Sequence, residues 1–383
     1  MRNIDLIMND LNKKYKDTII QEGTKQTSIK KIPFSSPMAN YMTYGGIPVG
    51  KITEFYGGEG GGKTTSALDI CSNAQKLFYK EHMDSVQQLN RCLKECTNKK
   101  ELLKLQNELD SLEEQGEKLV AYVDTEQTLD IEWAKLLGVD TNKLILVKPG
   151  EQTAEQILQI IIDIIKSGNI GLCVLDSIPC LVPQQIYTET LEKKAYGGIS
   201  QTLTIFSSKI LPYLVQNECG FIGINQIRED ISSMYNTIST PGGKAWKHAC
   251  SLRLRFIKDS LLDTDNREIS SRSENPAGNK VKMEISKTKV CKPDRRVGYY
   301  TLNYTTGIDV LADAVNVALY YGLIVKNGGW IKVLDNNGNV KIDDEGTTLQ
   351  FNGVVKFTEY LNTHTKFKES FLDTLLKLVS KIE

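Results

Sequence analysis

Residues 57–64 read Gly57-Gly58-Glu59-Gly60-Gly61-Gly62-Lys63-Thr64. They fit the pattern G-x-x-x-x-G-K-T, in which backbone N–H groups surround the phosphates of a nucleotide. The apolar run Ile52–Tyr56 before them predicts a strand, and the run Thr65–Phe78 after them predicts a helix. A phosphate loop requires this context, which makes a chance match improbable. The stretch therefore predicts an α/β fold of the P-loop class.

Each residue type in this loop has an expected chemical role. The glycines let the backbone approach phosphate oxygens closely. The start of the following helix, which includes Thr65, adds a favourable dipole. Lys63 is expected to reach the β- and γ-phosphates of ATP, and the Thr64 hydroxyl to bind Mg²⁺. Residues 57–65 are thus predicted to bind ATP and Mg²⁺.

Short apolar runs alternate with helical patterns from residue 52 to about residue 256. Such alternation predicts a mostly parallel, twisted sheet flanked by helices. The clearest helical patterns are 154–165 and 202–214. The expected strands are 52–56, 119–123, 144–147, 172–175, 221–224 and 252–256.

Composition limits the class of protein. The chain has 383 residues, 40% hydrophobic and 25% charged, which is ordinary for a globular protein with a substantial core. Lys+Arg and Asp+Glu are both 47, so any contact with nucleic acid depends on local placement of cations. The eight cysteines are scattered, which indicates a reducing cytosol rather than a disulfide framework. No apolar run could span a bilayer, so we expect a cytoplasmic protein without a membrane partner.

The segment from about residue 82 to 117 interrupts the alternation. Apolar residues recur at helical spacing on both sides of the polar break Thr97-Asn98-Lys99. The pattern predicts an antiparallel helical hairpin inserted between the first helix and the second strand, with Gly116 at its end. A plain solvated spacer is the alternative.

Carboxylates follow two of the expected strands. Asp176 ends the apolar run 172–175, a position from which an acid near a phosphate loop holds Mg²⁺. A helix N-cap is the alternative role for Asp176. Asp124 and Glu126 follow the strand 119–123, and either could activate the attacking water. The residues alone do not separate these two candidates.

The two ends of the chain differ from its centre. Residues 1–20 have the spacing of an amphipathic helix, and a polar stretch follows to about Lys31. Residues 257–280 are polar and predict a loop before a strand at 281–286. Beyond it we expect a helix at 310–320, a hairpin around Asn337-Gly338 and further helices. The expected domains are 1–31, an N-terminal polymerisation helix and linker; 32–308, the ATPase core; and 309–383, a small α+β domain.

Several separate blocks resemble bacterial and phage RecA recombinases. They are 46–57, 124–130, 137–140 and 224–228, and the likeness runs from about Ile32 to the C-terminal helices, except for the 82–117 insert. The resemblance implies Glu126 as the catalytic base. It also implies that Trp133 stacks on the adenine ring and that Asp130 contacts its edge. Gln226 would face the γ-phosphate and report nucleotide state to bound DNA.

The resemblance further implies two DNA-binding loops, at about 184–198 and 227–247. Both mix cations, glycines and an aromatic or Met side chain, which suits phosphate contacts and base stacking. Without the resemblance, each is equally well a mobile surface loop. The first loop departs from the family pattern at Tyr196, and the second is slightly shorter. The candidate DNA-binding residues are Lys193, Lys194, Tyr196, Gly197, Gly198, Arg228, Met234, Tyr235, Gly242, Gly243 and Lys244.

Lys287 and Lys289 match a paired-lysine block that reaches the ATP of the neighbouring subunit in this family. Such contacts would couple nucleotide binding to a helical filament. The resemblance implies a recombinase that polymerises on single-stranded DNA, pairs it with duplex DNA and exchanges strands. A RecA-fold repair accessory ATPase or ring helicase is the alternative, and a non-catalytic ATP-dependent scaffold is a third. The sequence identifies no loader protein.

Overall fold

The computed structural model describes residues 3–14, 29–187, 198–229, 238–335, 337–343 and 346–381. Contacts divide the chain into two units, Met1–Lys30 and Lys31–Glu383. The first unit contains α1 (Asn3–Lys14), which lies within the helix expected at 1–20. The division into three domains stays a prediction.

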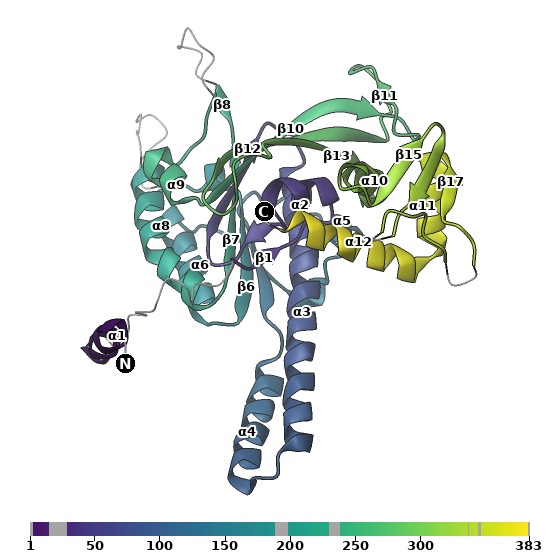
Figure 1. The fold of residues 1–383 in the computed structure, drawn as a ribbon. Helices are drawn as coiled ribbons and strands as arrows, with labels where there is room; N and C mark the ends of the chain where they lie inside the picture. The colour runs from purple at the N-terminus through teal and green to yellow at the C-terminus, as the bar shows by residue number, and fades with distance from the viewer. Residues whose placement is uncertain are drawn as a thin grey trace. The chain divides into compact units, whose positions relative to one another are not determined.

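A large sheet forms the centre of the second unit (Figure 1). Its middle strands are parallel and run in the order β10-β3-β7-β6-β4-β5. This arrangement confirms the predicted α/β class with a mostly parallel sheet. The strands are β3 (Ile52–Gly57), β4 (Leu119–Asp124), β5 (Leu144–Val147), β6 (Ile170–Asp176), β7 (Gly220–Gln226) and β10 (Leu252–Leu262).

An antiparallel extension continues the sheet beyond β10. It comprises β12 (Gly278–Thr288), β13 (Val297–Asn303) and β14 (Gly307–Ile308), and β11 (Glu268–Ile269) pairs with β10. The loop predicted at 257–280 is therefore wrong at both ends, because β10 continues to Leu262 and β12 begins at Gly278. Pairing between β10 and β12 satisfies the backbone while polar side chains alternate outward. Because the segment 257–280 is polar overall, its first residues were not recognised as the end of a strand.

Helices cover both faces of the parallel strands. On one face α6 (Ala154–Lys166), α8 (Gly198–Gln216) and α9 (Gly243–Ala249) share an apolar core with the sheet that includes Phe206, Phe221 and Trp246 (Figure 1). On the other face α3 contacts β3, β4, β6 and β7. Burial on both faces explains why these strands are nearly continuous hydrophobic runs.

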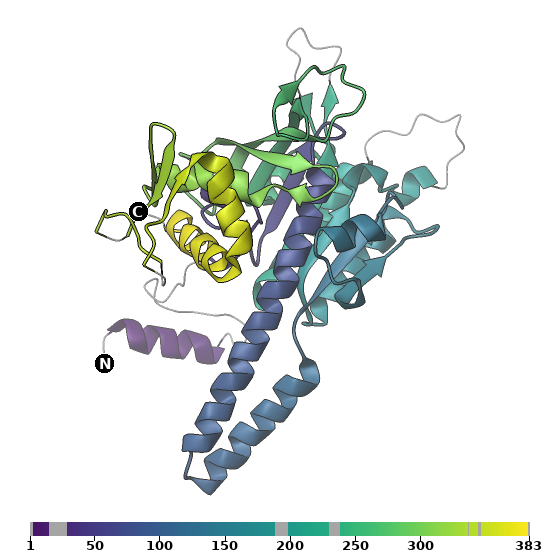
Figure 2. The same ribbon diagram turned by 90° about the vertical axis from the view of Figure 1, so that its right-hand side faces the viewer.

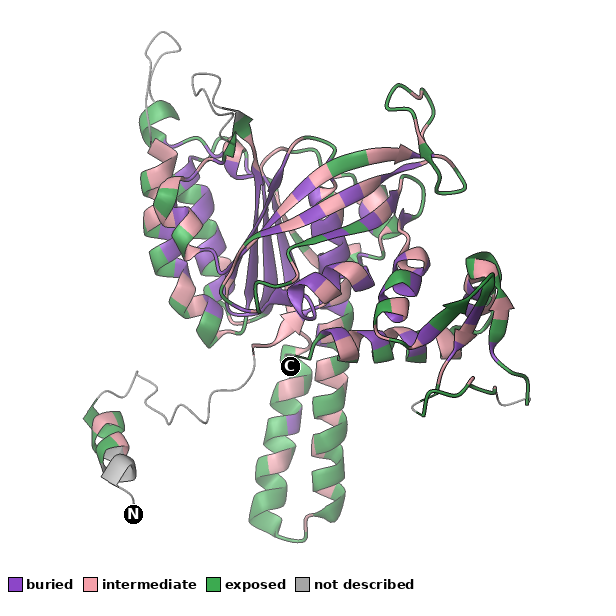
Figure 3. Ribbon diagram, turned by 45° about the horizontal axis from the view of Figure 1, so that its top comes forward, coloured by how far each residue is buried: buried purple, intermediate pink, exposed green. Residues whose placement is uncertain are grey.

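The predicted hairpin exists, but its first arm is not a separate helix. α3 runs without interruption from Lys63 to Glu95, because no Gly or Pro breaks the pattern after Phe78. The Asn98 side chain caps α4 (Lys99–Gln115), and Gly116 follows it as expected. Figures 2 and 3 show the two arms side by side and extending from the sheet, and Figure 3 shows them mostly exposed. Leu109 of α4 is buried.

The C-terminal part of the second unit has its own apolar core. α10 (Val310–Tyr320) matches the predicted helix, and α11 (Gly353–Thr363) and α12 (Thr365–Val379) follow. The hairpin predicted around Asn337-Gly338 is only a bridge between Leu334 and Val340. The main hairpin turns at Gly328-Gly329, and Ile324, Ile331 and Val333 of its two strands belong to the apolar core. Its strands are β15 (Ile324–Asn327) and β16 (Trp330–Val333), and β17 (Gln350–Asn352) pairs with β16.

Short elements connect these parts. Ser36 caps α2, and Pro37 occupies its first turn, where a missing N–H costs nothing. The remaining elements are β1 (Lys31–Ile32), α2 (Pro37–Thr43), β2 (Ile47–Pro48), α5 (Ile131–Leu136), α7 (Gln184–Tyr187), β8 (Arg228–Glu229), β9 (Ile238–Ser239) and two 3-10 turns, Thr141–Lys143 and Ile178–Cys180.

A buried carboxylate joins α10 to α2. Asp313 Oδ2 accepts hydrogen bonds from the Ser36 hydroxyl and from Met38 N, the latter at 3.0 Å. Asp313 is 3% exposed, and its Oδ1 has no hydrogen-bond partner among the described residues. Burial raises the pKa of Asp313 to about 7, and the Ser36 and Met38 hydrogen bonds oppose that rise. The folded protein therefore holds this proton more tightly than the unfolded chain does.

Asp313→Asn is expected to change how stability depends on pH. Because the folded-state pKa is raised, the contribution of Asp313 to stability is largest below about pH 4 and declines until about pH 7. The stability of the variant relative to wild type should therefore rise across that window, by at most about 1.4 kcal/mol per pH unit. Urea unfolding at pH 5 and pH 8 measures the difference. A difference that is the same at both pH values would contradict the assignment.

Candidate nucleotide-binding site

The phosphate loop connects β3, in the centre of the sheet, to α3. Gly62 precedes the first residue of α3 with φ +87°, and Gly60 has φ +65°. Residues with a side chain adopt this left-handed conformation only with strain, so both positions require glycine. The turn directs the loop over the carboxyl ends of β3 and β7, where ligands bind in open α/β sheets.

Lys63 lies inside the curve of this loop. Its Nζ donates to the Gly58 carbonyl oxygen over 2.7 Å, and the residue is 9% exposed. Burial lowers the pKa of Lys63, whereas Asp176, Glu126 and Glu59 oppose that shift. The negative charges of these three carboxylates therefore favour the protonated form of Lys63. The exposed Thr64 begins the outward face of the helix.

Asp176 joins the phosphate loop to β6. Its Oδ2 accepts hydrogen bonds from Thr64 Oγ1 at 2.9 Å and from the Tyr122 hydroxyl at 2.6 Å. Burial raises the pKa of Asp176, and these two hydrogen bonds oppose the rise. Burial and the Asp176 carboxylate also keep the pKa of Tyr122 well above 10, so Tyr122 remains a donor. Sequence reasoning missed Tyr122, although a Tyr within the buried strand 119–123 needed a partner.

The geometry distinguishes the two candidate bases. Asp124 is buried, and its oxygens accept from Thr128 N at 3.3 Å and Leu129 N at 3.1 Å, so it holds the turn after β4. Glu126 is partly exposed and accepts a hydrogen bond from the Ser177 hydroxyl. The negative charge of its carboxylate also favours the protonated form of Lys63, which raises the pKa of Lys63 against the effect of burial. The arrangement favours Glu126 over Asp124 as the residue that would meet a water near the phosphates.

A pocket of about 580 Å³ adjoins the loop. Trp133 lines it together with the residues from Gly60 to Thr65, so the sequence-predicted aromatic and phosphate loop share one cavity. Asp130 does not line it; its side chain caps α5 by accepting from the backbone of Glu132 and Trp133. The far wall was not predicted, because most of it comes from the antiparallel extension of the sheet. It consists of Lys258, Pro276, Asn279, Leu302 and Tyr304.

Gln226 ends β7 in register with Gly57, the first residue of the loop. The preceding residue, Asn225, is buried, and its Nδ2 donates to Glu54 Oε1 at 2.8 Å and to the Pro241 carbonyl at 3.0 Å. Gln226 N in turn donates to Asn225 Oδ1 at 3.0 Å. The end of β7 is therefore tied both to the strand that enters the phosphate loop and to the segment before α9.

Glu54 is the centre of this network and is fully buried. Besides Asn225, it accepts from Trp246 Nε1 at 3.0 Å and forms an ion pair with Arg253. Arg253 also donates to Thr240 Oγ1 over 3.3 Å. Four elements thus meet at one carboxylate. Sequence reasoning missed it, although an acid inside the apolar run 52–56 signals a paired buried charge.

The expected DNA-binding residues are only partly described. Lys193, Lys194, Tyr196, Gly197, Met234 and Tyr235 lie outside the described residues. Gly198 begins α8, and Arg228 lies in β8, which pairs with β9. Gly242 caps the N-terminus of α9, and Gly243 and Lys244 form its first turn. The segment expected as a loop to Lys247 thus ends in a short helix.

Lys287 and Lys289 contact the end of α9. Lys287 Nζ donates to the carbonyls of Lys247 at 2.5 Å and His248 at 2.9 Å, and Lys289 Nζ donates to His248 at 3.0 Å. Cations at a helix C-terminus satisfy its free carbonyls. Neither lysine lines the pocket beside this chain's own phosphate loop.

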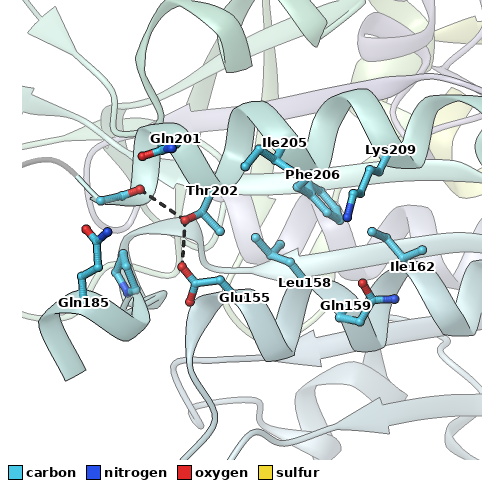
Figure 4. A pocket seen from close by; sticks show the side chains of 12 residues that line it. Glu155, Leu158, Gln159, Ile162, Gln185, Gln201, Thr202, Ile205, Phe206 and Lys209 are labelled. Atoms are coloured by element: carbon cyan, nitrogen blue, oxygen red, sulfur yellow. Dashed lines mark hydrogen bonds between the residues drawn. The ribbon is translucent and has the colours of Figure 1, made fainter. Parts of the chain in front are cut away.

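A second pocket, of about 300 Å³, lies between α6 and α8. Figure 4 shows Thr202 directed at Glu155, with the Thr202 hydroxyl donating over 3.0 Å. The rest of the pocket lining is mixed: apolar residues such as Leu158, Ile205 and Phe206 alternate with Gln159, Gln185, Gln201 and Lys209. Ile205 is 50% exposed, so this surface is partly uncovered.

The donor set at the phosphate loop fits Mg²⁺. This ion prefers a few protein oxygens together with water and substrate phosphates. The Thr64 hydroxyl and the Asp176 carboxylate are such oxygens and lie 2.9 Å apart. Among the described residues, no group of three or more His, Cys, Asp or Glu side chains is arranged to hold a metal. Within the same described part of the chain, no helix is both long and apolar enough to cross a membrane.

Comparison with known proteins gives consistent matches. A family model described as the RecA N-terminal domain matches residues 2–86 and 97–309. "Protein RecA" of Ureaplasma parvum is 30% identical over 319 residues, which cover 83% of this chain and 80% of that protein. "Protein RecA" of Thermus aquaticus is 30% identical over 340 residues, covering 88% and 82%. "Protein RecA" of Mycoplasma mobile is 29% identical over 340 residues, covering 88% of each.

Proposed function

Because the chain belongs to the RecA family, we propose that it is an ATP-dependent DNA recombinase. It forms helical filaments on single-stranded DNA and catalyses homologous pairing and strand exchange. The observation that carries the proposal is the junction of Lys63, Thr64 and Asp176 with Glu126 at the carboxyl edge of the sheet. That constellation suits hydrolysis of a nucleoside triphosphate. That the enzyme depends on DNA and is cytoplasmic is part of the proposal and rests on the family.

The proposed nucleotide site uses the loop and the adjoining pocket. Residues 57–65 bind the triphosphate through backbone N–H groups, and Lys63 neutralises the β- and γ-phosphates. Trp133 stacks on the adenine. Asp130, which caps α5 beside Trp133, is proposed to reach the adenine edge from outside the residues that line the pocket. Thr64 and Asp176 would hold Mg²⁺, which when bound neutralises phosphate charge. Tyr122 keeps the Asp176 carboxylate oriented toward Thr64.

Glu126 is the proposed base for hydrolysis. Its carboxylate accepts a proton from the attacking water, and the Ser177 hydroxyl orients it by donating a hydrogen bond. Gln226 is the proposed sensor of the γ-phosphate, because a neutral amide can bind a γ-phosphate oxygen in ATP and loses that partner in ADP. Its neighbour Asn225 offers a path from this change to Pro241, which lies within the second DNA-binding segment, 227–247.

DNA is proposed to bind along the segments 184–198 and 227–247. Cations and backbone N–H groups of these segments hold phosphates, and apolar side chains stack against bases. Lys287 and Lys289 are proposed to reach the ATP of the neighbouring subunit. In that event they exchange the α9 carbonyls for phosphate oxygens. Residues 1–31 would dock on the adjacent subunit, residues 32–308 would form the ATPase core, and residues 309–383 would form a small α+β C-terminal domain.

A strand-exchange assay tests the proposal against a ring helicase or repair accessory ATPase. With ATP, Mg²⁺, single-stranded circular DNA and homologous linear duplex, joint molecules are expected, and electron microscopy should show helical filaments. Ring-shaped particles that unwind duplex without forming joint molecules would reject the recombinase. ATP hydrolysis without DNA stimulation would reject both DNA-dependent functions.

A further inference from the structure

The far end of the α3–α4 hairpin is strongly basic. We call residues 91–104 the hairpin tip. They contain five cations and two anions, and every charged side chain among them is exposed. The cations are Arg91, Lys94, Lys99, Lys100 and Lys104; the anions are Glu95 and Glu101.

The charge is segregated along the hairpin. Residues 105–117 contain no Lys or Arg and five acids, Glu108, Asp110, Glu113, Glu114 and Glu117. The chain as a whole has no net charge, so the tip is a local cationic surface on a neutral protein. A solvated helix that served only as a spacer would gain from mixing the two signs along its faces.

The cations of the tip do little for the fold. The one ion pair that joins a tip cation among the described residues is Lys104 to Glu108, at 3.8 Å and well exposed, and such pairs contribute little. Lys100 and Lys104 are four residues apart in α4, a spacing at which like charges repel. The packing of the two arms relies instead on apolar residues such as Leu109.

The position of the tip suits a contact made outside the ATPase core. α3 continues for 17 residues beyond Phe78, the last buried residue on this helix, which corresponds to about 25 Å of helix. Figures 1 and 2 show no other described part of this unit beside the tip. The match to the family model omits residues 87–96, so the end of α3 lies outside what that model describes.

We propose that the hairpin tip is an accessory DNA-binding surface that holds the phosphate backbone of duplex DNA. This inference rests on the proposed function, which brings duplex DNA to the same filament. Duplex DNA has the densest array of phosphates, and exposed lysines neutralise phosphates without needing a fixed geometry. The tip thus captures the second DNA, while the segments at 184–198 and 227–247 hold the first. An acidic protein is the competing occupant.

Fluorescence anisotropy of a labelled, non-homologous duplex tests the inference with the full-length protein and a slowly hydrolysed ATP analogue. The neutralised variant is R91Q/K94Q/K99Q/K100Q, and the matched control, R91K/K94R/K99R/K100R, keeps every charge. Each lost phosphate contact should make the slope of log affinity against log salt shallower by ~0.9. We therefore expect a slope change of about 2–4 and at least about tenfold weaker duplex binding at low salt for the neutralised variant alone.

Single-stranded DNA-stimulated ATP hydrolysis separates this inference from the proposed function. The neutralised variant should retain wild-type hydrolysis and an unchanged melting temperature, because its substituted side chains are exposed. If wild type hydrolyses ATP in response to DNA and both variants bind duplex as it does, the inference is overturned and the recombinase stands. Equal loss of duplex binding in both variants would also overturn it, since charge would not be the cause. A wild type that binds no DNA rejects the proposed function itself.

Discussion

Glu126→Gln is expected to slow DNA-stimulated ATP hydrolysis by about 10²–10⁴-fold, the usual contribution of a general base. The amide has the shape of the carboxylate and can still accept the Ser177 hydrogen bond, but it cannot take a proton from water. Nucleotide binding and DNA binding should therefore persist. Steady-state hydrolysis gives kcat, and a fluorescent ATP analogue gives the affinity.

Asp124→Asn provides the matched comparison. Asp124 is buried and holds Thr128 N and Leu129 N, so its loss should act through the turn after β4. We expect lower stability with hydrolysis reduced far less than in Glu126→Gln. The reverse pattern, normal turnover in Glu126→Gln and none in a stable Asp124→Asn, would transfer the role of base to Asp124.

Glu54→Leu is expected to be the most destabilising substitution near the site. It removes the partner of Arg253, whose side chain is only 13% exposed, and leaves Trp246 Nε1 without its acceptor. Breaking a buried ion pair from one side costs about 3–5 kcal/mol. Urea unfolding, followed by tryptophan fluorescence because Trp246 is in the network, measures the loss.

Removal of both charges gives the control. In Glu54→Leu/Arg253→Met no buried cation is left unpaired, so much of the lost stability should return. DNA stimulation of hydrolysis should nevertheless stay impaired, because Thr240 and Asn225 lose their links to the centre of the network. A double variant as unstable as the single one would show that packing around Glu54, rather than its charge, governs stability.

Much of the fold follows from local patterns. The strands at β3 to β7 are short apolar runs whose ends agree with the expected ranges to within two residues, because burial on both faces demands continuous hydrophobic sequence. The phosphate loop was recognisable because its glycines and lysine must be contiguous. The hairpin was predicted from its apolar spacing, although the continuity of α3 from Lys63 to Glu95 was not.

Other parts could not be predicted from local patterns. β13 was missed because it mixes exposed and buried residues, and its pairing with β12 depends on residues distant in the chain. The pocket wall at Leu302 and Tyr304 was missed for the same reason. The roles proposed for all the candidate site residues stay predictions, among them those of Lys63, Glu126, Asp130, Gln226, Lys287, Lys289 and the DNA-binding residues.

By itself, the sequence determined the phosphate loop, the order of the parallel strands along the chain and the acids at or just after the ends of β4 and β6. These features depend on neighbouring residues, whose spacing decides the backbone they can form. Only the tertiary structure decided that Glu126 rather than Asp124 faces Ser177, that Tyr122 holds Asp176, and that Glu54 joins four elements. Such contacts depend on which strands lie next to each other in the sheet. Hydrogen bonds between residues about 50 to 200 positions apart leave no periodic pattern in the sequence.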